Sequence, residues 1–158
     1  MFSYEPIGII HSPFNTPEGM PIQPAGAKDI RGSVEVDDKY EDGLGDIEGF
    51  SHIILVYHFH LVTGFDLKVT PFIDDQPHGL FSTRAPRRPN PIGLSVVRLV
   101  LREGNTLQIE GVDVLDGTPL LDIKPFSPEF DCPESARTGW MEKAKGKVQE
   151  KKADDRFK

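Results

Sequence analysis

The stretch Ser51–Leu61 decides the fold class, and it reads Ser-His-Ile-Ile-Leu-Val-Tyr-His-Phe-His-Leu. Every second residue from position 53 onward is apolar, namely Ile53, Leu55, Tyr57, Phe59 and Leu61. The alternate positions mix apolar residues with His52, His58 and His60. A side-chain period of two predicts a β-strand with one face in the core and a half-polar opposite face, as in a strand lining a barrel or an interface.

Other short strands are predicted on both sides of this one, at Tyr4–Ile10, Ser33–Val36, Leu94–Glu103, Leu107–Val114 and Pro119–Lys124. Turn signals at Glu103–Thr106 and Asp116–Gly117 separate the last three, which predicts a meander. Within Leu94–Glu103, we expect Val97, Leu99 and Leu101 to share one face. The last strand is expected to carry Asp122 and Lys124 on the same side as Thr118.

Helix is scarce in this sequence, which has 14 prolines and 15 glycines spread through most of its length. One helical turn is predicted at Tyr40–Leu44, and the segment from Trp140 fits either a docked terminal helix or a frayed tail. A long proline-rich loop is predicted at Ser12–Lys28. The predicted fold is all-β: a small closed or nearly closed β-barrel of short, mainly antiparallel strands, with residues 1–140 as its single domain and 141–158 as a Lys-rich C-terminal tail.

Composition narrows the class of protein. The chain has 158 residues, 37% of them hydrophobic, and one cysteine, Cys132. A single cysteine excludes an internal disulfide framework and fits a reducing compartment. Neither a signal peptide nor an apolar run long enough to span a bilayer is present, so we expect a cytoplasmic protein without membrane contact.

Charge is unevenly distributed along this acidic chain, whose net charge is −7. Residues 29–48 hold eight acids, whereas residues 76–102 hold none and carry Arg84, Arg87, Arg88, Arg98 and Arg102. Arginines without anionic neighbours repel one another, and their planar forks suit phosphate and carboxylate. The segment therefore favours an anionic ligand or RNA, although the net charge alone argues against nucleic acid.

Three other kinds of site are not supported by the sequence. Gly43–Gly49 has the wrong spacing for a dinucleotide fingerprint and precedes a strand rather than a helix. The histidines of Ser51–Leu61 have no Asp, Glu or Cys at ligand spacing, so no metal site is predicted. A Ser-His-Asp hydrolase is not supported, because no G-x-S-x-G elbow exists.

The block Arg84–Ser95 has a more specific pattern. Pro86, Pro89 and Pro91 fix three backbone φ angles and push their preceding residues toward extended geometry. Backbone carbonyls in such a strip stay free to face a ligand, and Gly93 permits close approach of another group. A stiff connection between strands is the alternative, but it leaves the crowding of Arg84, Arg87, Arg88 and Asn90 unexplained.

Together, Arg88–Ser95, Asp116–Pro119 and Leu121–Pro125 resemble the TrmO/TsaA (YaeB-like) family, and the resemblance runs from about Tyr4 to Phe126. It implies a small β-barrel that binds S-adenosylmethionine and methylates N6 of threonylcarbamoyl-adenosine, just 3′ of the anticodon in tRNA. It further implies a homodimer with the cofactor near the subunit interface. The additional C-terminal domain of longer bacterial members has no counterpart after the Lys-rich tail.

The resemblance also assigns the cofactor-binding residues: Pro21, Ile22, Gln23, His60, Leu61, Arg84, Leu94, Asp116, Gly117, Thr118 and Pro119. At two of these positions the chain departs from the family, because Ile22 replaces an arginine and Leu61 replaces a glutamine. Both changes remove a polar contact, which affects substrate choice more than cofactor binding. Arg87, Arg88 and Asn90 are the predicted RNA-binding residues.

Methyl transfer from a sulfonium is an in-line displacement in which positioning and electrostatic matching do most of the work. An acceptor near the N6 proton helps as charge develops, and Asp122 and His60 are the candidates. Two alternatives to a tRNA methyltransferase stay open. One is a non-catalytic S-adenosylmethionine- or RNA-binding module, and the other is a small-molecule methyltransferase on the same barrel.

Overall fold

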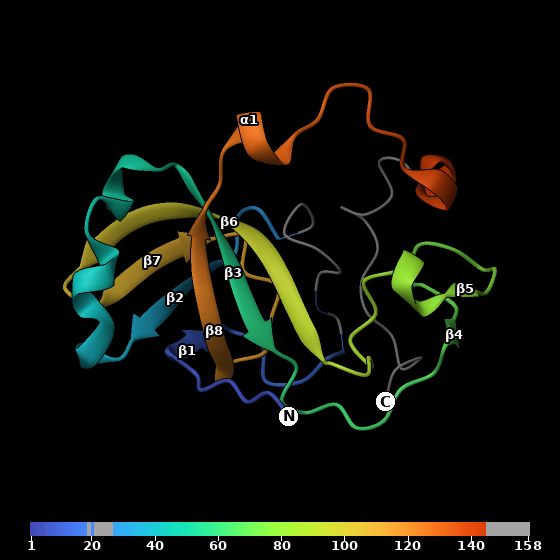
Figure 1. Cartoon of the computed structure of the whole chain (residues 1–158), viewed down its shortest axis with the longest axis horizontal. Helices are drawn as coiled ribbons and strands as arrows, with labels where there is room; N and C mark the ends of the chain where they lie inside the picture. The colour runs from blue at the N-terminus through green and yellow to red at the C-terminus, as the bar shows by residue number, and fades with distance from the viewer. Residues whose placement is uncertain (19, 21–26, 145–158) are drawn as a thin grey trace.

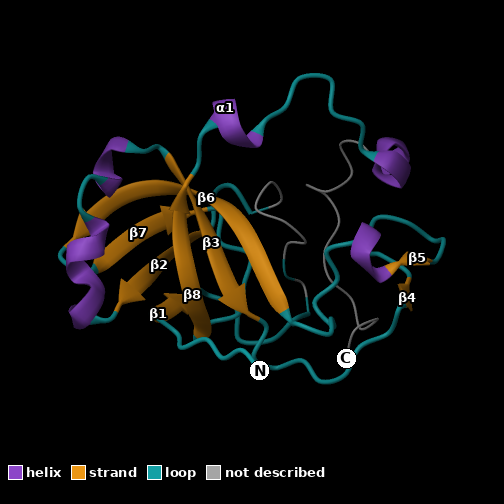
Figure 2. Cartoon of the chain, viewed as in Figure 1, coloured by secondary structure: helices purple, strands orange, loops and turns teal. Residues whose placement is uncertain are grey.

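The computed structural model describes residues 1–18, 20 and 27–144. Six strands close into an antiparallel barrel in the order β1-β2-β7-β6-β3-β8, and β8 pairs back with β1 (Figures 1 and 2). The strands are β1 (Gly8–His11), β2 (Arg31–Val36), β3 (His52–His58), β6 (Ile92–Glu103), β7 (Thr106–Glu110) and β8 (Thr118–Pro125). The predicted all-β barrel is thus confirmed, and its closure leaves no unpaired sheet edge.

The interior of the barrel follows the period-two pattern of the central strand. Ile53, Leu55 and Tyr57 of β3 are all buried, while the alternate residues of the strand are only partly buried. Inward-facing residues of the other strands complete the core: Ile10, Val34, Val36, Val97, Leu99, Leu107, Ile109 and Leu120. The strand thus packs one face into the core, as its sequence predicts.

Several strand limits and one connection differ from the prediction. β3 ends at His58, so Leu61, which is predicted to face the core, lies beyond the strand and is 65% exposed. β1 begins at Gly8 because residues 1–6 are exposed and Pro6 has no N–H for a ladder. β7 ends at Glu110, since Gly111 takes a φ of 92° and turns the chain across the barrel. The predicted meander is wrong, because β8 pairs with β1 and β3 and not with β7.

Two bulges change which side chains face inward. The register of β6 against β7 shifts between Leu99 and Leu101, so Leu101 is 50% exposed instead of sharing the inner face with Leu99. β8 shifts against β3 opposite Val56/Tyr57. Thr118 therefore faces the core and Asp122 the outside, which corrects the expectation that they share a face.

Short elements surround the barrel. The 3₁₀ helices η2 (Asp38–Leu44) and η3 (Ile47–Gly49) pack on one end, and η2 contains the predicted helical turn at Tyr40–Leu44 (Figure 1). Beyond the other end, residues 59–91 form an excursion with β4 (Lys68–Val69), β5 (His78–Gly79) and η4 (Leu80–Ser82). Its apolar cluster of Val69, Leu80 and Ala85 is separate from the barrel core.

The chain after the barrel contains α1 (Pro128–Asp131) and η5 (Gly139–Ala144). The Trp140 ring stacks on His78 with centroids 4.4 Å apart, and its Nε1 donates to the Ser82 carbonyl over 2.8 Å. The predicted boundary at residue 140 falls inside η5, and residues 145–158 of the predicted tail lie outside the described ranges. None of the helices in those ranges has the length and apolar composition of a membrane span.

Candidate active site at one end of the barrel

One end of the barrel gathers the residues predicted to bind a cofactor; we call it the site end. β1, β3 and β7 end here, and β2, β6 and β8 begin here. All the predicted cofactor residues that the structure describes lie in the connections at this end or in the first residues of the following strands: His60, Leu61, Arg84, Leu94, Asp116, Gly117, Thr118 and Pro119. Pro21, Ile22 and Gln23 lie outside the described residues, so their placement stays a prediction.

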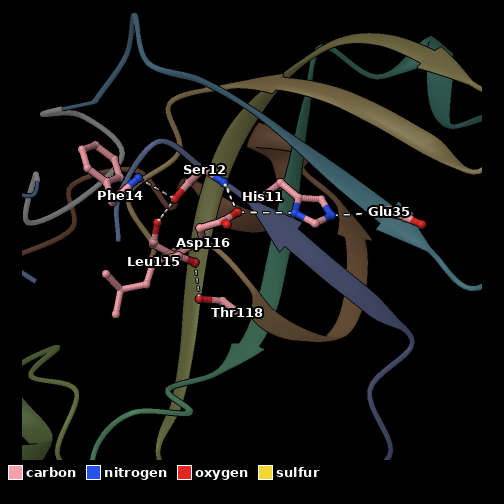
Figure 3. A network of polar contacts seen from close by, with 8 residues as sticks. His11, Ser12, Phe14, Glu35, Leu115, Asp116 and Thr118 are labelled. Carbon is pink, nitrogen blue, oxygen red and sulfur yellow. Dashed lines mark hydrogen bonds and ion pairs between the residues drawn. The ribbon is translucent and has the colours of Figure 1, made fainter. Parts of the chain in front are cut away.

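Asp116 is held in place by a network between β1 and β2 (Figure 3). Its Oδ1 accepts a hydrogen bond from the Ser12 backbone N–H over 3.1 Å and lies 3.4 Å from His11 Nδ1. The other ring nitrogen of His11 lies 3.2 Å from Glu35 Oε2. These contacts hold one carboxylate oxygen of Asp116 in place and orient the half-exposed side chain. Asp116 can therefore accept hydrogen bonds from a ligand in addition to forming the turn.

The backbone of the Asp116–Pro119 turn is hydrogen-bonded to β1. Gly117 has a φ of 80°, which favours glycine, and its N–H donates to the Ile10 carbonyl over 2.9 Å. Thr118 is buried and its hydroxyl donates to the Leu115 carbonyl over 2.6 Å (Figure 3). The Thr118 side chain therefore stabilises the turn, and Asp116 is the side chain that the turn presents.

The arginines of the proline-rich block divide into two kinds. Arg88 Nη1 donates to the carbonyls of Thr83 and Ala85, over 2.9 and 3.1 Å, and so holds the excursion together. Arg87 Nε donates to a backbone carbonyl of the same excursion. Arg84 and Asn90 are exposed, whereas Arg87 and Arg88 are partly buried.

The premise that these arginines lack anionic neighbours is wrong, because Arg84 lies near enough to Asp113 to lower the pKa of its carboxyl and three others form ion pairs. Arg87, Arg98 and Arg102 each form an ion pair with an acid from another segment: Asp66 at 3.4 Å, Glu110 at 2.8 Å and Glu48 at 3.3 Å. The acid-free run along the sequence is therefore not an acid-free surface. Arg84 and Asn90 are the polar predicted ligand residues of the block that are exposed to solvent.

Gly93 shows why the block ends in a glycine. A Cβ at this position would lie 2.5 Å from Tyr57 Cε2 and 2.6 Å from Phe59 Cζ. The two rings pack edge to face with centroids 5.4 Å apart, directly against the β6 backbone. The predicted close approach at Gly93 is thus made by the protein's own Tyr57, whose hydroxyl then reaches inward along β6.

The structure separates the two candidate proton acceptors. His60 follows β3 at the site end, and burial together with the neighbouring His58 lowers its pKa from the ordinary value. Asp122 lies on the outer wall, where Lys124 Nζ approaches its Oδ2 to 2.9 Å. Among the described residues, no three His, Cys, Asp or Glu side chains gather as a metal site.

Two predicted cofactor residues are exposed apolar side chains. Leu61 follows β3 and is 65% exposed, and Leu94 lies on the outer wall of the barrel, 47% exposed. Leu94 points away from the core because its neighbours Gly93 and Ser95 face inward. A ligand that contacts Leu94 therefore reaches the outer face of β6 at this end.

Sequence reasoning missed a polar group inside the site end. The Tyr57 hydroxyl lies 2.8 Å from Ser95 Oγ, and Ser95 Oγ donates to Asp113 Oδ1 over 2.7 Å. Tyr57 and Ser95 are buried, and Asp113 is partly buried in the connection from β7 to β8. The signal in the sequence is one acid between two valines, Val112 and Val114, which are themselves buried and close the barrel end.

The environment of Asp113 changes its ionisation. Burial raises the pKa of this carboxyl to about 7, while the hydrogen bond from Ser95 and the nearby Arg84 guanidinium oppose the rise. Burial and the charge of Asp113 also raise the pKa of Tyr57, so its phenol stays protonated. A carboxyl poised near neutral pH at the mouth of a barrel can take up and release a proton.

Comparison of the sequence with known proteins identifies a family and several relatives. The family model described as the tRNA-methyltransferase O N-terminal domain matches residues 9–132. A probable S-adenosyl-L-methionine-binding protein of Pyrococcus abyssi is 59% identical over 99% of this chain and 85% of its own length. The human tRNA (adenine(37)-N6)-methyltransferase is 35% identical over 83% of this chain, which covers 31% of the human protein.

A solved structure has the same architecture. The crystal structure of TrmO from Pseudomonas aeruginosa superposes with a TM-score of 0.75 at 39% identity, over 89% of this chain and 62% of that one. This chain thus spans less than two thirds of that protein and under a third of the human one, and it aligns with most of the Pyrococcus relative. With the family model covering most of its length, the chain belongs to the tRNA-methyltransferase O family, through that family's N-terminal domain.

Proposed function

We propose that this protein is an S-adenosylmethionine-dependent tRNA methyltransferase that acts on N6 of the threonylcarbamoyl-modified adenosine next to the anticodon. The observation that carries the proposal is the gathering of separate sequence segments at the site end. Asp113 and Asp116 lie in the connection from β7 to β8, and Arg84 lies near enough to Asp113 to lower the pKa of its carboxyl. Such work on tRNA would take place in the cytoplasm.

The residues at the site end fit the cofactor chemically. S-adenosylmethionine supplies a methyl group on a positively charged sulfur, and it also carries an ammonium, a carboxylate and ribose hydroxyls. Asp116 is oriented by Ser12 and His11 to accept from hydroxyl or ammonium groups. The exposed guanidinium of Arg84 suits the carboxylate of the cofactor or of the threonylcarbamoyl group.

The tRNA must be bound by an acidic protein, so its contacts have to be local. Arg84 and Asn90 are the exposed polar residues of the proline-rich block, and we assign them to the RNA backbone or the modified base. Arg87 and Arg88 support them by fixing the excursion from which they project. We therefore assign direct RNA contacts to Arg84 and Asn90, and a supporting role to Arg87 and Arg88.

The outer wall of β3 and β6 supports a homodimer with the cofactor near the interface. Ile92 and Leu94 are 41% and 47% exposed, and they lie beside His58 and Val56 of the neighbouring strand. Apolar residues this exposed and adjacent mark an interaction surface rather than isolated surface residues. A partner seated on this wall would cover Leu94 close to the site end, as the family assignment of Leu94 requires.

A methyl-transfer assay tests the proposal against its alternatives. The protein is incubated with methyl-labelled S-adenosylmethionine and with tRNA either carrying or lacking the threonylcarbamoyl group. Label on the threonylcarbamoylated tRNA alone supports the proposed substrate. Label on both would assign a less specific tRNA methyltransferase, and cofactor binding without label on either would identify a non-catalytic module or a small-molecule enzyme.

A further inference from the structure

The Tyr57–Ser95–Asp113 group is a directed chain of hydrogen bonds. Ser95 has one hydroxyl proton, which it donates to Asp113 Oδ1 over 2.7 Å. The 2.8 Å contact between Tyr57 and Ser95 then has to be donated by the Tyr57 hydroxyl. Both hydroxyls point toward Asp113, so together they hold its carboxylate in one orientation with Oδ1 engaged.

Placing the polar Tyr57–Ser95–Asp113 group in an apolar core has an energetic cost, and this cost argues against a purely structural role for the group. Most other side chains inside the barrel are apolar, and polar groups placed in such a core destabilise it unless they are fully hydrogen-bonded. Pinning the connection from β7 to β8 needs only a neutral acceptor, which an asparagine would provide. An ionisable carboxyl adds nothing to pinning, yet it is what the chain places at the site end beside Arg84.

We infer that Asp113 accepts the proton that the N6 nitrogen of the target adenosine loses during methyl transfer, and that Ser95 and Tyr57 are its positioning residues. This inference rests on the proposed function. In the balanced step, N6 forms the bond to the methyl carbon, and the carbon–sulfur bond breaks with its electron pair left on sulfur. The N6 proton moves to Asp113 Oδ2, because Ser95 already engages Oδ1, and later passes to solvent.

The other acids and bases near this end are less suited to the same task. Asp122 lies on the outer wall with Lys124. One oxygen of Asp116 is occupied by Ser12 and His11, and its role is to hold the cofactor. His60 lies in the open connection after β3, where no hydrogen bond to another described residue orients its ring. Asp113 alone combines a fixed orientation with ionisation near neutral pH.

The isosteric variant Asp113→Asn tests this role, because its side-chain oxygen can still accept from Ser95 but cannot take a proton. We expect kcat for tRNA methylation to fall on the order of a hundredfold to ten-thousandfold. S-adenosylmethionine affinity, measured by calorimetry, should change by less than about threefold, since positioning and proton transfer are separate functions. The matched control is Asp42→Asn, an exposed carboxylate in η2 at the opposite end, which should leave both quantities unchanged.

A pH profile distinguishes proton acceptance from structural support. The hydrogen bond from Ser95 lowers the pKa of Asp113, so Ser95→Ala should move the acidic limb of the kcat profile to higher pH. Tyr57→Phe keeps the ring packing but releases the Ser95 hydroxyl, and it should lower kcat with little change in KM. A profile unmoved by Ser95→Ala would contradict the inference.

Two outcomes overturn the role of Asp113 while leaving the proposed function standing. The first is methylation by Asp113→Asn at the wild-type rate. The second is loss of cofactor binding in that variant, which would make Asp113 a cofactor contact. If the wild-type protein itself transfers no methyl group to tRNA, both the proposed function and this inference are contradicted, and the wild-type control reveals which case applies.

Discussion

At the scale of single residues, the site end depends on close packing between the proline-rich block and β3. The glycine in that block could be predicted to allow close approach, but its partner could not, because Tyr57 lies 36 residues away along the chain and meets it only across the β3–β6 ladder. The same contact sends the Tyr57 hydroxyl to Ser95 and thus to Asp113.

Replacing Gly93 with alanine should destabilise the fold. The added Cβ would meet the rings of Tyr57 and Phe59 at 2.5 and 2.6 Å, a distance that forces the backbone or the rings to move. We expect a loss of roughly 1–3 kcal/mol in the free energy of unfolding, measured by urea titration. Gly43→Ala is the control, because nothing lies within 4 Å of its added Cβ. Equal effects of both changes would contradict this packing.

Asp116→Asn should weaken S-adenosylmethionine binding without unfolding the turn. The amide can still accept from the Ser12 N–H but loses the charge that suits hydroxyl and ammonium donors. A hydrogen bond to a charged group contributes about 1.5–3 kcal/mol, so the Kd measured by calorimetry should rise roughly tenfold to a hundredfold. An unchanged Kd would remove Asp116 from the cofactor site.

At the scale of elements, the positions of the strands along the chain could be predicted more reliably than their pairing partners in the sheet. The period of two predicts the central strand, and the turn signal at Glu103–Thr106 predicts the hairpin between β6 and β7, because both signals are local. The pairing of β8 with β1 and β3 depends on closure of the whole sheet, which no local pattern encodes. The bulge in β8 likewise moved Asp122 to the outer wall, since one extra residue reverses the alternation.

The excursion is attached to the C-terminal helix η5 by a cluster that should respond to pH. The hydrogen bond from His78 holds the pKa of Asp74 at about 2, below its ordinary value, and Trp140 stacks on the same His78 ring. The folded state therefore releases the Asp74 proton more readily than the unfolded state does. The stabilising contribution is complete above about pH 4 and is lost as the pH falls toward 2.

Fluorescence measures this transition directly, because Trp140 is the single tryptophan of the chain. We expect its emission to shift toward that of an exposed indole as the pH is lowered through this window. Asp74→Asn should abolish the pH dependence within it, whereas Glu134→Gln, at an exposed carboxylate outside this cluster, should leave it in place. A signal that stays constant down to pH 2 would contradict the proposed link between Asp74 and η5.

At the scale of the whole molecule, the barrel is a scaffold that brings distant segments to one end. The residues of the Asp116 turn and Arg84 could be assigned from family resemblance, and the structure places both in connections at the site end. Asp113 cannot be found this way, because the sequence predicts a continuous strand from 107 to 114 that includes it. Only the break after Glu110 turns it toward Ser95.

The raised pKa of Asp113 should be visible in the stability of the whole protein. Between the ordinary carboxyl pKa and about 7, the folded state binds more protons than the unfolded state does, so the free energy of unfolding falls as the pH rises through this range. Asp113→Asn should flatten this dependence and should increase stability above pH 7. Urea titrations at a series of pH values measure it, and a variant that is destabilised above pH 7 would contradict the assignment.

The exposed apolar side chains on the outer wall of β3 and β6 predict that a charged substitution there changes the oligomeric state. Leu94→Glu should place a charge in the proposed interface and yield a monomer, because a buried unpaired carboxylate is costly. Analytical ultracentrifugation measures the change, and Val100→Glu, an exposed position farther along β6, is the control. A wild-type protein that is already monomeric at high concentration would contradict the dimer.

The most direct test of the central claim is mass spectrometry of nucleosides from tRNA that has been incubated with the protein and labelled S-adenosylmethionine. The proposed chemistry at the site end predicts that threonylcarbamoyl-adenosine is converted to its N6-methylated form, with the label in the new methyl group. Arg84→Ala should reduce this product. Threonylcarbamoyl-adenosine that stays unmodified while the protein binds S-adenosylmethionine would contradict the claim.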